Sequence, residues 1–179
     1  MSYKKKKFII FDFIVLVILV ALDQFTKYLA VQHLKDQPEI ALIDGVLEFK
    51  YLENRGAAFG MMQNQTYFFI FISFVVIFSL SYLIYKLPDD KKFNALHICF
   101  VAILAGAIGN NLFDRVILNY VIDFIYFKLI NFPIFNLADI YVSLSTVLLC
   151  VLLLFYYKDN DLNFITFKEK KYRKIEEQD

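Results

Sequence analysis

The chain is short of the residues that most enzymes use for metal or nucleophilic chemistry, with two histidines and two cysteines among 179 residues. His33 and His97 are too far apart for a zinc site of the His-Glu-x-x-His kind, and that motif is absent. No Gly-x-Ser-x-Gly element of a serine hydrolase occurs. We therefore expect no metal, no cofactor and no serine nucleophile.

The cysteines and the net charge argue against a disulfide-bonded protein and a nucleic-acid-binding protein. Cys99 and Cys150 both lie inside apolar runs, where a cysteine is typically a small buried hydrophobic residue, so no disulfide is expected. The formal net charge is only +1, which gives no case for nucleic-acid binding.

The chain is instead rich in long hydrophobic stretches. Hydrophobic residues make up 59% of it, 18% is aromatic and the mean hydropathy is +0.54, too apolar for an ordinary soluble domain. A bilayer core about 30 Å thick needs roughly 20 helical residues. Four apolar stretches satisfy this, and the predicted spans are about 8–31, 66–87, 93–113 and 137–157.

The first stretch resembles a cleavable signal peptide, because Lys4–Lys7 precede an apolar run. No Ala-x-Ala cleavage site follows it, and the helical pattern continues through Asp23 and Lys27. These two lie four residues apart on one helix face and can neutralise each other. We expect a retained first span, in which Asp12 lies near the cytoplasmic end and matters little for activity.

Basic residues predict the orientation. The N-terminal tail, the loop between the second and third spans, and the C-terminal tail together hold 13 of the 19 lysines and arginines. Such segments stay in the cytoplasm. Both termini are therefore expected inside, with Asp123 and Asp139 at the outer membrane face.

The fold class predicted is a mainly α membrane protein, one domain over 1–179, with a small outer sheet. Alternation of Leu47, Phe49 and Tyr51 with charged residues, after the turn signal Asp44-Gly45, indicates strands in an antiparallel β region at about 38–60. Residues 114–136 are expected as a second outer loop and 158–179 as a frayed cytoplasmic tail.

Asp123 and Asp139 each stand at the edge of an apolar run, where a carboxylate is costly to place. Two neighbouring carboxyl groups without a metal ligand set are typical of a shared-proton dyad. The hypothesis is an intramembrane aspartic peptidase. The alternative is a four-span transporter or assembly factor whose acids gate protons or ions, although such acids would favour the bilayer midplane.

Other polar groups lie around these acids. Asn54 and Arg55 either belong to a tight turn or donate hydrogen bonds to the backbone of a bound peptide. Gly106, Ala107 and Gly109 are expected to pack helices closely. At the end of the third span, Asp114 is expected to be structural and Arg115 to belong to the active site.

Five motifs in order resemble those of the lipoprotein signal peptidase (signal peptidase II) family, over about residues 8–157. They are Asp23-Gln24-Phe25-Thr26-Lys27, Asn54-Arg55-Gly56-Ala57-Ala58-Phe59-Gly60, Asn111-x-x-Asp114-Arg115, Val121-Ile122-Asp123-Phe124 and Phe135-Asn136-Leu137-Ala138-Asp139.

The resemblance implies a monomeric aspartic peptidase of the bacterial cytoplasmic membrane, surrounded by membrane lipids. It would cut diacylglyceryl-prolipoprotein before the lipid-modified cysteine. By motif position Asp123 and Asp139 are catalytic, and the supporting or substrate-binding positions are Asp23, Lys27, Asn54, Arg55, Asn110, Asn111, Arg115 and Asn136.

One position departs from the family pattern. A glycine usually precedes the motif asparagine, but here Asn110 stands there and Gly109 is one step further back. Either the helix absorbs one extra residue, or Asn110 is the equivalent position.

Overall fold

Four long apolar helices form the body of the protein, in a computed structural model that describes residues 3–56 and 62–165. They are α1 (Tyr3–Leu34), α2 (Thr66–Lys86), α3 (Asn94–Ala107) and α5 (Leu137–Val151). Each is long and apolar enough to span a bilayer when the helical turns that flank α3 and α5 are included. The expected mainly α, four-span class is confirmed.

Two helices continue beyond their regular α part. A π-helix, Ile108–Asp114, joins α3 to the short α4 (Arg115–Leu118), and a π turn, Leu152–Tyr156, extends α5. Apolar side chains such as Phe13, Phe78 and Leu154 remain exposed on the outside of the bundle, where lipid would surround them. Residues 57–60 of the glycine-rich motif and most of the predicted tail, 166–179, lie outside the described residues.

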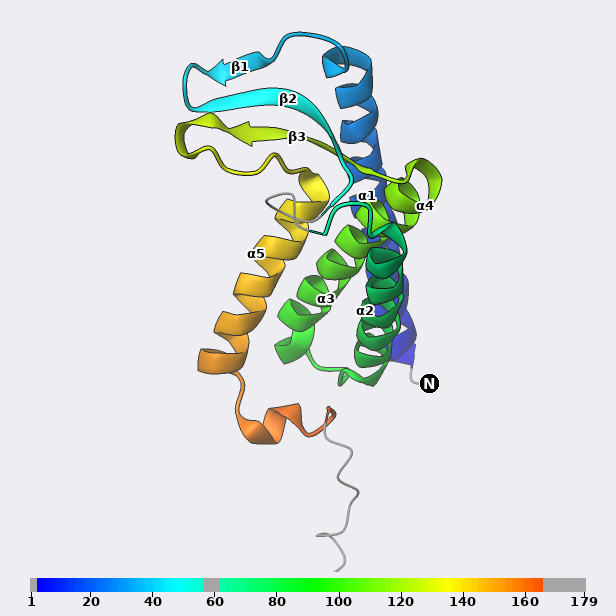
Figure 1. Ribbon diagram of the computed structural model, residues 1–179. Coiled ribbons are helices and arrows are strands. Elements are labelled where there is room, and N and C mark those ends of the chain that lie inside the picture. Colours follow the sequence, from blue (N-terminus) through cyan, green and yellow to red (C-terminus); the bar gives the residue numbers. More distant parts are fainter. Residues whose placement is uncertain (1–2, 57–61, 166–179) are drawn as a thin grey trace, which may run out of the picture.

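A three-stranded antiparallel sheet covers one end of the bundle (Figure 1). It consists of β1 (Ile40–Ile43), β2 (Leu47–Asn54) and β3 (Val121–Phe127), in that order. The turn between β1 and β2 contains the expected Asp44-Gly45, and Gly45 has φ +68°, a left-handed conformation that favours glycine. The small antiparallel sheet is confirmed.

The third strand was not predicted, because β3 lies in the segment expected to be a loop. Its first four residues, Val121–Phe124, are all buried, so the sequence lacks the alternation of apolar and polar residues that marks a half-buried strand. β3 pairs with β2 in a register that sets Asn54 opposite Val121 and Leu52 opposite Asp123. The pairing brings Asn54 and Asp123 together from positions 69 residues apart.

Small residues allow close packing where α3 meets α5 and α1. A Cβ atom at Gly106 would lie 2.9 Å from the carbonyl oxygen of Ala138, and one at Gly109 would lie 2.5 Å from a carboxylate oxygen of Asp23. Both helices can approach α3 only because these side chains are absent. The expected packing role of Gly106 and Gly109 is therefore confirmed.

The end of the bundle away from the sheet is closed by an apolar cluster of Leu87, Phe93, Leu96, Phe100 and Tyr157. Part of the segment expected as a frayed tail folds onto it. Asp159–Leu162 form a 3₁₀ turn, Asp161 pairs with Lys92 at 2.6 Å, and the Phe164 ring packs edge-on against Phe93.

Asp12, which is expected to matter little for activity, has a buried structural partner that was not predicted. Its carboxylate lies 2.7 Å from Nδ1 of His97, and each side chain is only 8% exposed. The Phe8 ring stacks on the imidazole, with centroids 5.3 Å apart. The pair ties α1 to α3 far from the sheet.

Replacing Asp12 with alanine should lower stability without affecting the chemistry. The variant leaves His97 buried without its partner, which costs about 1–3 kcal/mol of unfolding free energy. Thermal unfolding in detergent measures the loss, with Phe13→Ala, a change at an exposed neighbour, as the control. An Asp12→Ala/His97→Ala variant should be less destabilised than the sum of the single changes, whereas simple additivity would refute a direct interaction.

Candidate active site

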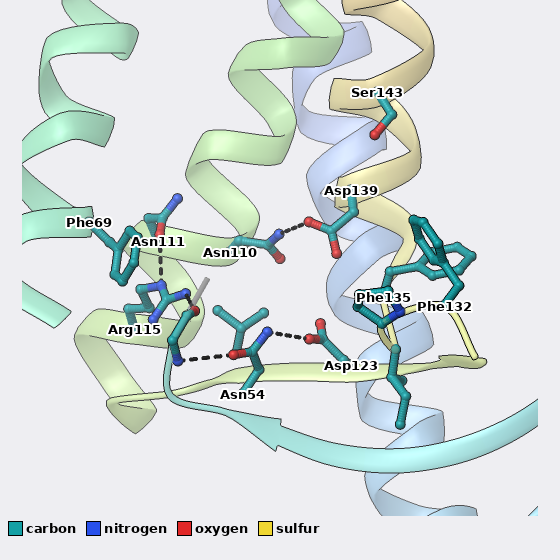
Figure 2. A pocket seen from close by; sticks show the side chains of 14 residues that line it. Asn54, Phe69, Asn110, Asn111, Arg115, Asp123, Phe132, Phe135, Asp139 and Ser143 are labelled. Atoms are coloured by element: carbon teal, nitrogen blue, oxygen red, sulfur yellow. Dashed lines mark hydrogen bonds between the residues drawn. The ribbon is translucent and has the colours of Figure 1, made fainter. Parts of the chain in front are cut away.

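Asp123 and Asp139 line one cavity of about 360 Å³ between the sheet and the helices (Figure 2). Asp123 comes from β3, and Asp139 comes from the first turn of α5. Two carboxyl groups that are 16 residues apart in sequence therefore face one space from two different elements.

Asn136 connects the two carboxyl groups. It is the N-cap of α5, and its side-chain oxygen accepts a hydrogen bond from the backbone N–H of Asp139 at 3.1 Å. The Asn136 N–H donates in return to Asp139 Oδ2 at 3.0 Å, which completes a capping box. The side-chain nitrogen of Asn136, Nδ2, donates to Asp123 Oδ1 at 2.7 Å. One helix cap thus sets the position of both acids.

Two more asparagines donate to the remaining carboxyl oxygens. Asn54 Nδ2 donates to Asp123 Oδ2 at 2.8 Å, and Asn110 Nδ2 donates to Asp139 Oδ1 at 2.9 Å (Figure 2). The Asn54 amide is oriented because its oxygen accepts from the Gly56 N–H at 3.0 Å. Each of the four carboxyl oxygens therefore accepts one N–H bond from an uncharged amide.

Behind the cavity a buried lysine lies between two carboxylates. Lys27 Nζ is 2.8 Å from Asp23 Oδ2 and 2.8 Å from Asp114 Oδ2, and all three side chains are at most 2% exposed. The expected neutralisation of Asp23 by Lys27 is present, with Asp114 as a second anion. Lys27 also donates to the Asn110 oxygen at 2.6 Å, so this cluster contacts the cavity through Asn110.

Arg115 lines the cavity but makes no hydrogen bond to either dyad carboxyl group within the described residues. Its Nε donates to Asn111 Oδ1 at 2.9 Å and its Nη2 to the Gly56 carbonyl at 2.6 Å. The guanidinium lies 4.3 Å from the centroid of the Phe69 ring. Its Nη1 is buried and has no hydrogen-bond partner in the described part of the chain.

Arg55 is placed apart from the other residues predicted for the site. It is not among the residues that line the cavity, and its side chain is 52% exposed. Its guanidinium lies 3.5 Å from the Glu53 carboxylate and 5.4 Å from the centroid of the Tyr120 ring. The neighbouring Asn54, the last residue of β2, lines the cavity instead.

The apolar wall of the cavity and one polar group were not predicted from the sequence. The wall residues are Phe69, Val121, Phe132, Pro133, Ile134 and Phe135, and the polar residue is Ser143. Ser143 follows Asp139 by four positions, so helical spacing could have placed it on the same face. Gln24, which donates to Asp114 at 2.9 Å, was inside a recognised motif but was not assigned a role.

The environment of Asp123 favours its protonated form. Burial and, to a lesser extent, the nearby charge of Asp139 together raise the pKa of Asp123 to about 7, although the hydrogen bonds from Asn54 and Asn136 oppose the shift. A carboxyl group with this pKa can hold a proton near neutral pH. No group of three or more His, Cys, Asp or Glu residues that could hold a metal ion occurs in the described ranges.

A model of the family described as signal peptidase (SPase) II matches residues 15–155. The chain belongs to the signal peptidase II family. The protein is therefore a membrane aspartic peptidase, as the resemblance implied. The matched range contains every residue predicted for the site.

Two curated relatives carry the name lipoprotein signal peptidase. That of Caldanaerobacter subterraneus subsp. tengcongensis is 46% identical over 143 residues, which is 79% of this chain and 94% of the relative. That of Clostridioides difficile is 37% identical over 145 residues, which is 80% of this chain and 94% of the relative.

A solved structure has the same fold. It is a bacterial membrane enzyme determined by the in meso method at 2.3 Å, with a TM-score of 0.71 and 28% identity. The match covers 89% of this chain and 94% of that one.

The raised pKa of Asp123 predicts a pH-dependent difference between the parent and the Asp123→Asn variant. Native Asp123 keeps its proton up to about pH 7, whereas the unfolded carboxyl group loses it near its ordinary value of 3.8. Asp123 therefore stabilises the fold below pH 4, and this contribution is lost as the pH rises to 7. Because asparagine does not titrate, the variant should gain stability relative to the parent over this range.

Thermal unfolding midpoints of both proteins between pH 4 and 8 test this difference. Glu39→Gln is the control, because Glu39 is exposed and its pKa is lowered by a hydrogen bond with its own backbone and by Lys50. Its difference from the parent should be small and opposite in sign. A difference between Asp123→Asn and the parent that stayed constant with pH would contradict the assignment.

Proposed function

We propose that this signal peptidase II removes the signal peptide from diacylglyceryl-modified prolipoproteins by cutting on the N-terminal side of the lipid-modified cysteine. The observation that carries the proposal is the pair Asp123 and Asp139 in one cavity, each held by uncharged amide donors. The names of the curated relatives supply the substrate class.

Asp139 is the better placed of the two acids to act as the ionised base. Both acids accept N–H bonds on both oxygens, but only Asp139 lies at the N-terminus of α5, where the helix dipole stabilises negative charge. Asp123, whose pKa is about 7, is suited to hold the shared proton. Two close carboxyl groups cannot both ionise cheaply, so the pair titrates as a unit.

The reaction then needs no covalent enzyme intermediate. Asp139 takes a proton from water, whose oxygen attacks the scissile carbonyl carbon, while protonated Asp123 donates to the carbonyl oxygen. The tetrahedral intermediate collapses as the C–N bond breaks. The proton held by Asp139 passes to the leaving amine, and Asp123 recovers its proton from the intermediate's hydroxyl group.

The apolar wall suits a lipid-bearing substrate. Phe69 on one side and the segment 132–135 on the other border the carboxyl groups with aromatic and aliphatic surface. The lipid and the apolar signal helix would supply binding energy from the membrane, and this energy would hold the scissile bond at the dyad. Surrounding membrane lipids are the other expected partner.

A location in the bacterial cytoplasmic membrane, with both termini inside, follows from the basic residues. The sheet and the dyad would then lie at the outer face. A monomer suffices for catalysis, because both acids and their amide donors come from one chain. A transporter or assembly factor is disfavoured, since one acid lies in β3 and the other in the first turn of α5, and the sheet covers one end of the bundle.

Asp123→Asn and Asp139→Asn should each abolish cleavage of a diacylated prolipoprotein, because each removes half of the shared-proton system. The loss should be at least about 10³-fold, at the scale of general acid–base catalysis. The assay uses purified enzyme in lipid, and the native thermal transition checks folding.

Ser81→Ala, a change on α2 outside the cavity, is the matched control and should retain activity. Addition of EDTA should leave the parent's rate unchanged. Substantial turnover by either Asn variant, or reversible inhibition by EDTA, would overturn the dyad mechanism.

The orientation predicts which cysteines an impermeant maleimide reaches on intact cells. In a chain with Cys99 and Cys150 replaced by alanine, Lys128→Cys should be labelled and Lys91→Cys should react only after permeabilisation. Both positions are exposed, so labelling depends on the side of the membrane. Labelling of position 91 but not 128 on intact cells would reverse the orientation.

A further inference from the structure

The π-helix Ile108–Asp114 carries two adjacent asparagines, Asn110 and Asn111, at the border of the active site. A π-helix forms i→i+5 hydrogen bonds, so it fits one more residue into a turn than an α-helix does, and such turns are frequent at functional sites. The helices on either side, α3 and α4, are regular. The extra residue is thus confined to the turn that carries both asparagines.

Asn110 lies between a cation and a catalytic acid. Its oxygen accepts from Lys27 Nζ at 2.6 Å, and its nitrogen donates to Asp139 Oδ1 at 2.9 Å. An ammonium group has donors only, so the amide oxygen must face Lys27. The NH₂ group must then face Asp139, and Lys27 therefore fixes the orientation in which Asn110 serves the dyad.

Asn111 has a different partner and a different direction. Its oxygen accepts from Arg115 Nε at 2.9 Å, and it makes no hydrogen bond to either dyad carboxyl group within the described residues. Figure 2 shows its side chain directed toward Arg115 and Phe69, whereas Asn110 points toward Asp139. Arg115 is held against Phe69 and the Gly56 carbonyl, so its buried Nη1, which has no hydrogen-bond partner among the described residues, has a fixed position at the cavity.

We propose that the π turn divides two positioning tasks between these neighbours: Asn110 orients the base Asp139, and Asn111 orients Arg115 toward substrate. The proposal deepens the proposed peptidase function and rests on it. Asn110 acts on the chemical step through Asp139, whereas Asn111 acts on substrate binding through Arg115.

Steady-state cleavage of a diacylated prolipoprotein by the full chain in lipid separates the two tasks. Asn110→Ala should lower kcat roughly ten- to a hundredfold, the effect of losing one hydrogen bond to a charged group, with little change in KM. Asn111→Ala should raise KM by roughly fivefold with kcat nearly retained, since its bond to Arg115 is lost.

Asn110→Asp distinguishes positioning from simple space filling. Aspartate keeps the size of the side chain and the acceptor for Lys27, but it places an oxygen where the NH₂ group faced Asp139. The variant should lose kcat at least as severely as Asn110→Ala while keeping the native thermal transition. Parent-like kcat in this variant would overturn the role of Asn110, and equal kcat losses in the Asn110 and Asn111 alanine variants would overturn the division.

A single-residue deletion tests the π turn itself. Removing either asparagine yields the same chain, with one asparagine directly after Gly109 and three residues before Asp114. The turn should become α-helical and leave this asparagine between Lys27 and Asp139. We expect kcat within roughly threefold of the parent and a raised KM, as for Asn111→Ala.

Deletion of Ile98, a lipid-facing residue in the regular part of α3, is the matched control. The regular part of α3 has no extra residue, so this deletion should rotate the residues on one side of it to a different helix face and abolish cleavage. Loss of kcat in the asparagine deletion as large as in the Ile98 deletion would overturn the proposal. If instead the parent failed to cleave this substrate, or Asp123→Asn retained turnover, the proposed function itself would fail, which is a separate outcome.

Discussion

The structure depends on the burial of one ammonium group. Lys27 lies between the carboxylates of Asp23 and Asp114, and no member of this cluster is more than 2% exposed. The carboxylates extend the connection, because Asp23 accepts the backbone N–H of Ala138 at 3.0 Å and Asp114 accepts that of Ile122 at 3.2 Å. Since a buried charge that loses its partner is strongly destabilising, this cluster fixes α1, the π-helix after α3, α5 and β3 relative to one another.

The dyad is built on the opposite electrostatic principle. Full positive charges are directed elsewhere: Lys27 is already balanced by Asp23 and Asp114, and Arg115 bonds to Asn111 and the Gly56 carbonyl. Uncharged amides hold Asp123 and Asp139 in place, so their positions are fixed without compensating both charges. Such a pair retains a proton, and a shared-proton peptidase needs that proton as its acid.

Much of this arrangement could be predicted from local sequence. Charge-free runs indicated the four spans, and acids at the edges of apolar runs indicated Asp123 and Asp139. What could not be predicted depends on contacts between distant segments. β3 has no strand alternation because the bundle buries both its faces, and the partner of Asp12 is 85 residues away. The departure from the family pattern already allowed for one extra residue in the helix, but the different partners of Asn110 and Asn111 depend on the π turn and were not predicted.

The sheet explains how water chemistry is possible in so apolar a chain. β2 and β3 supply Asn54 and Asp123 at the end of the bundle, and the cap of α5 supplies Asp139 at the same level. The dyad therefore lies where a helix begins, so that the helix dipole can stabilise its negative charge, and not in the middle of a span. Because the wall beside it is aromatic and aliphatic, one end of the cavity suits a peptide bond and the other a lipid. A peptidase for membrane-anchored substrates needs both environments within one substrate's reach.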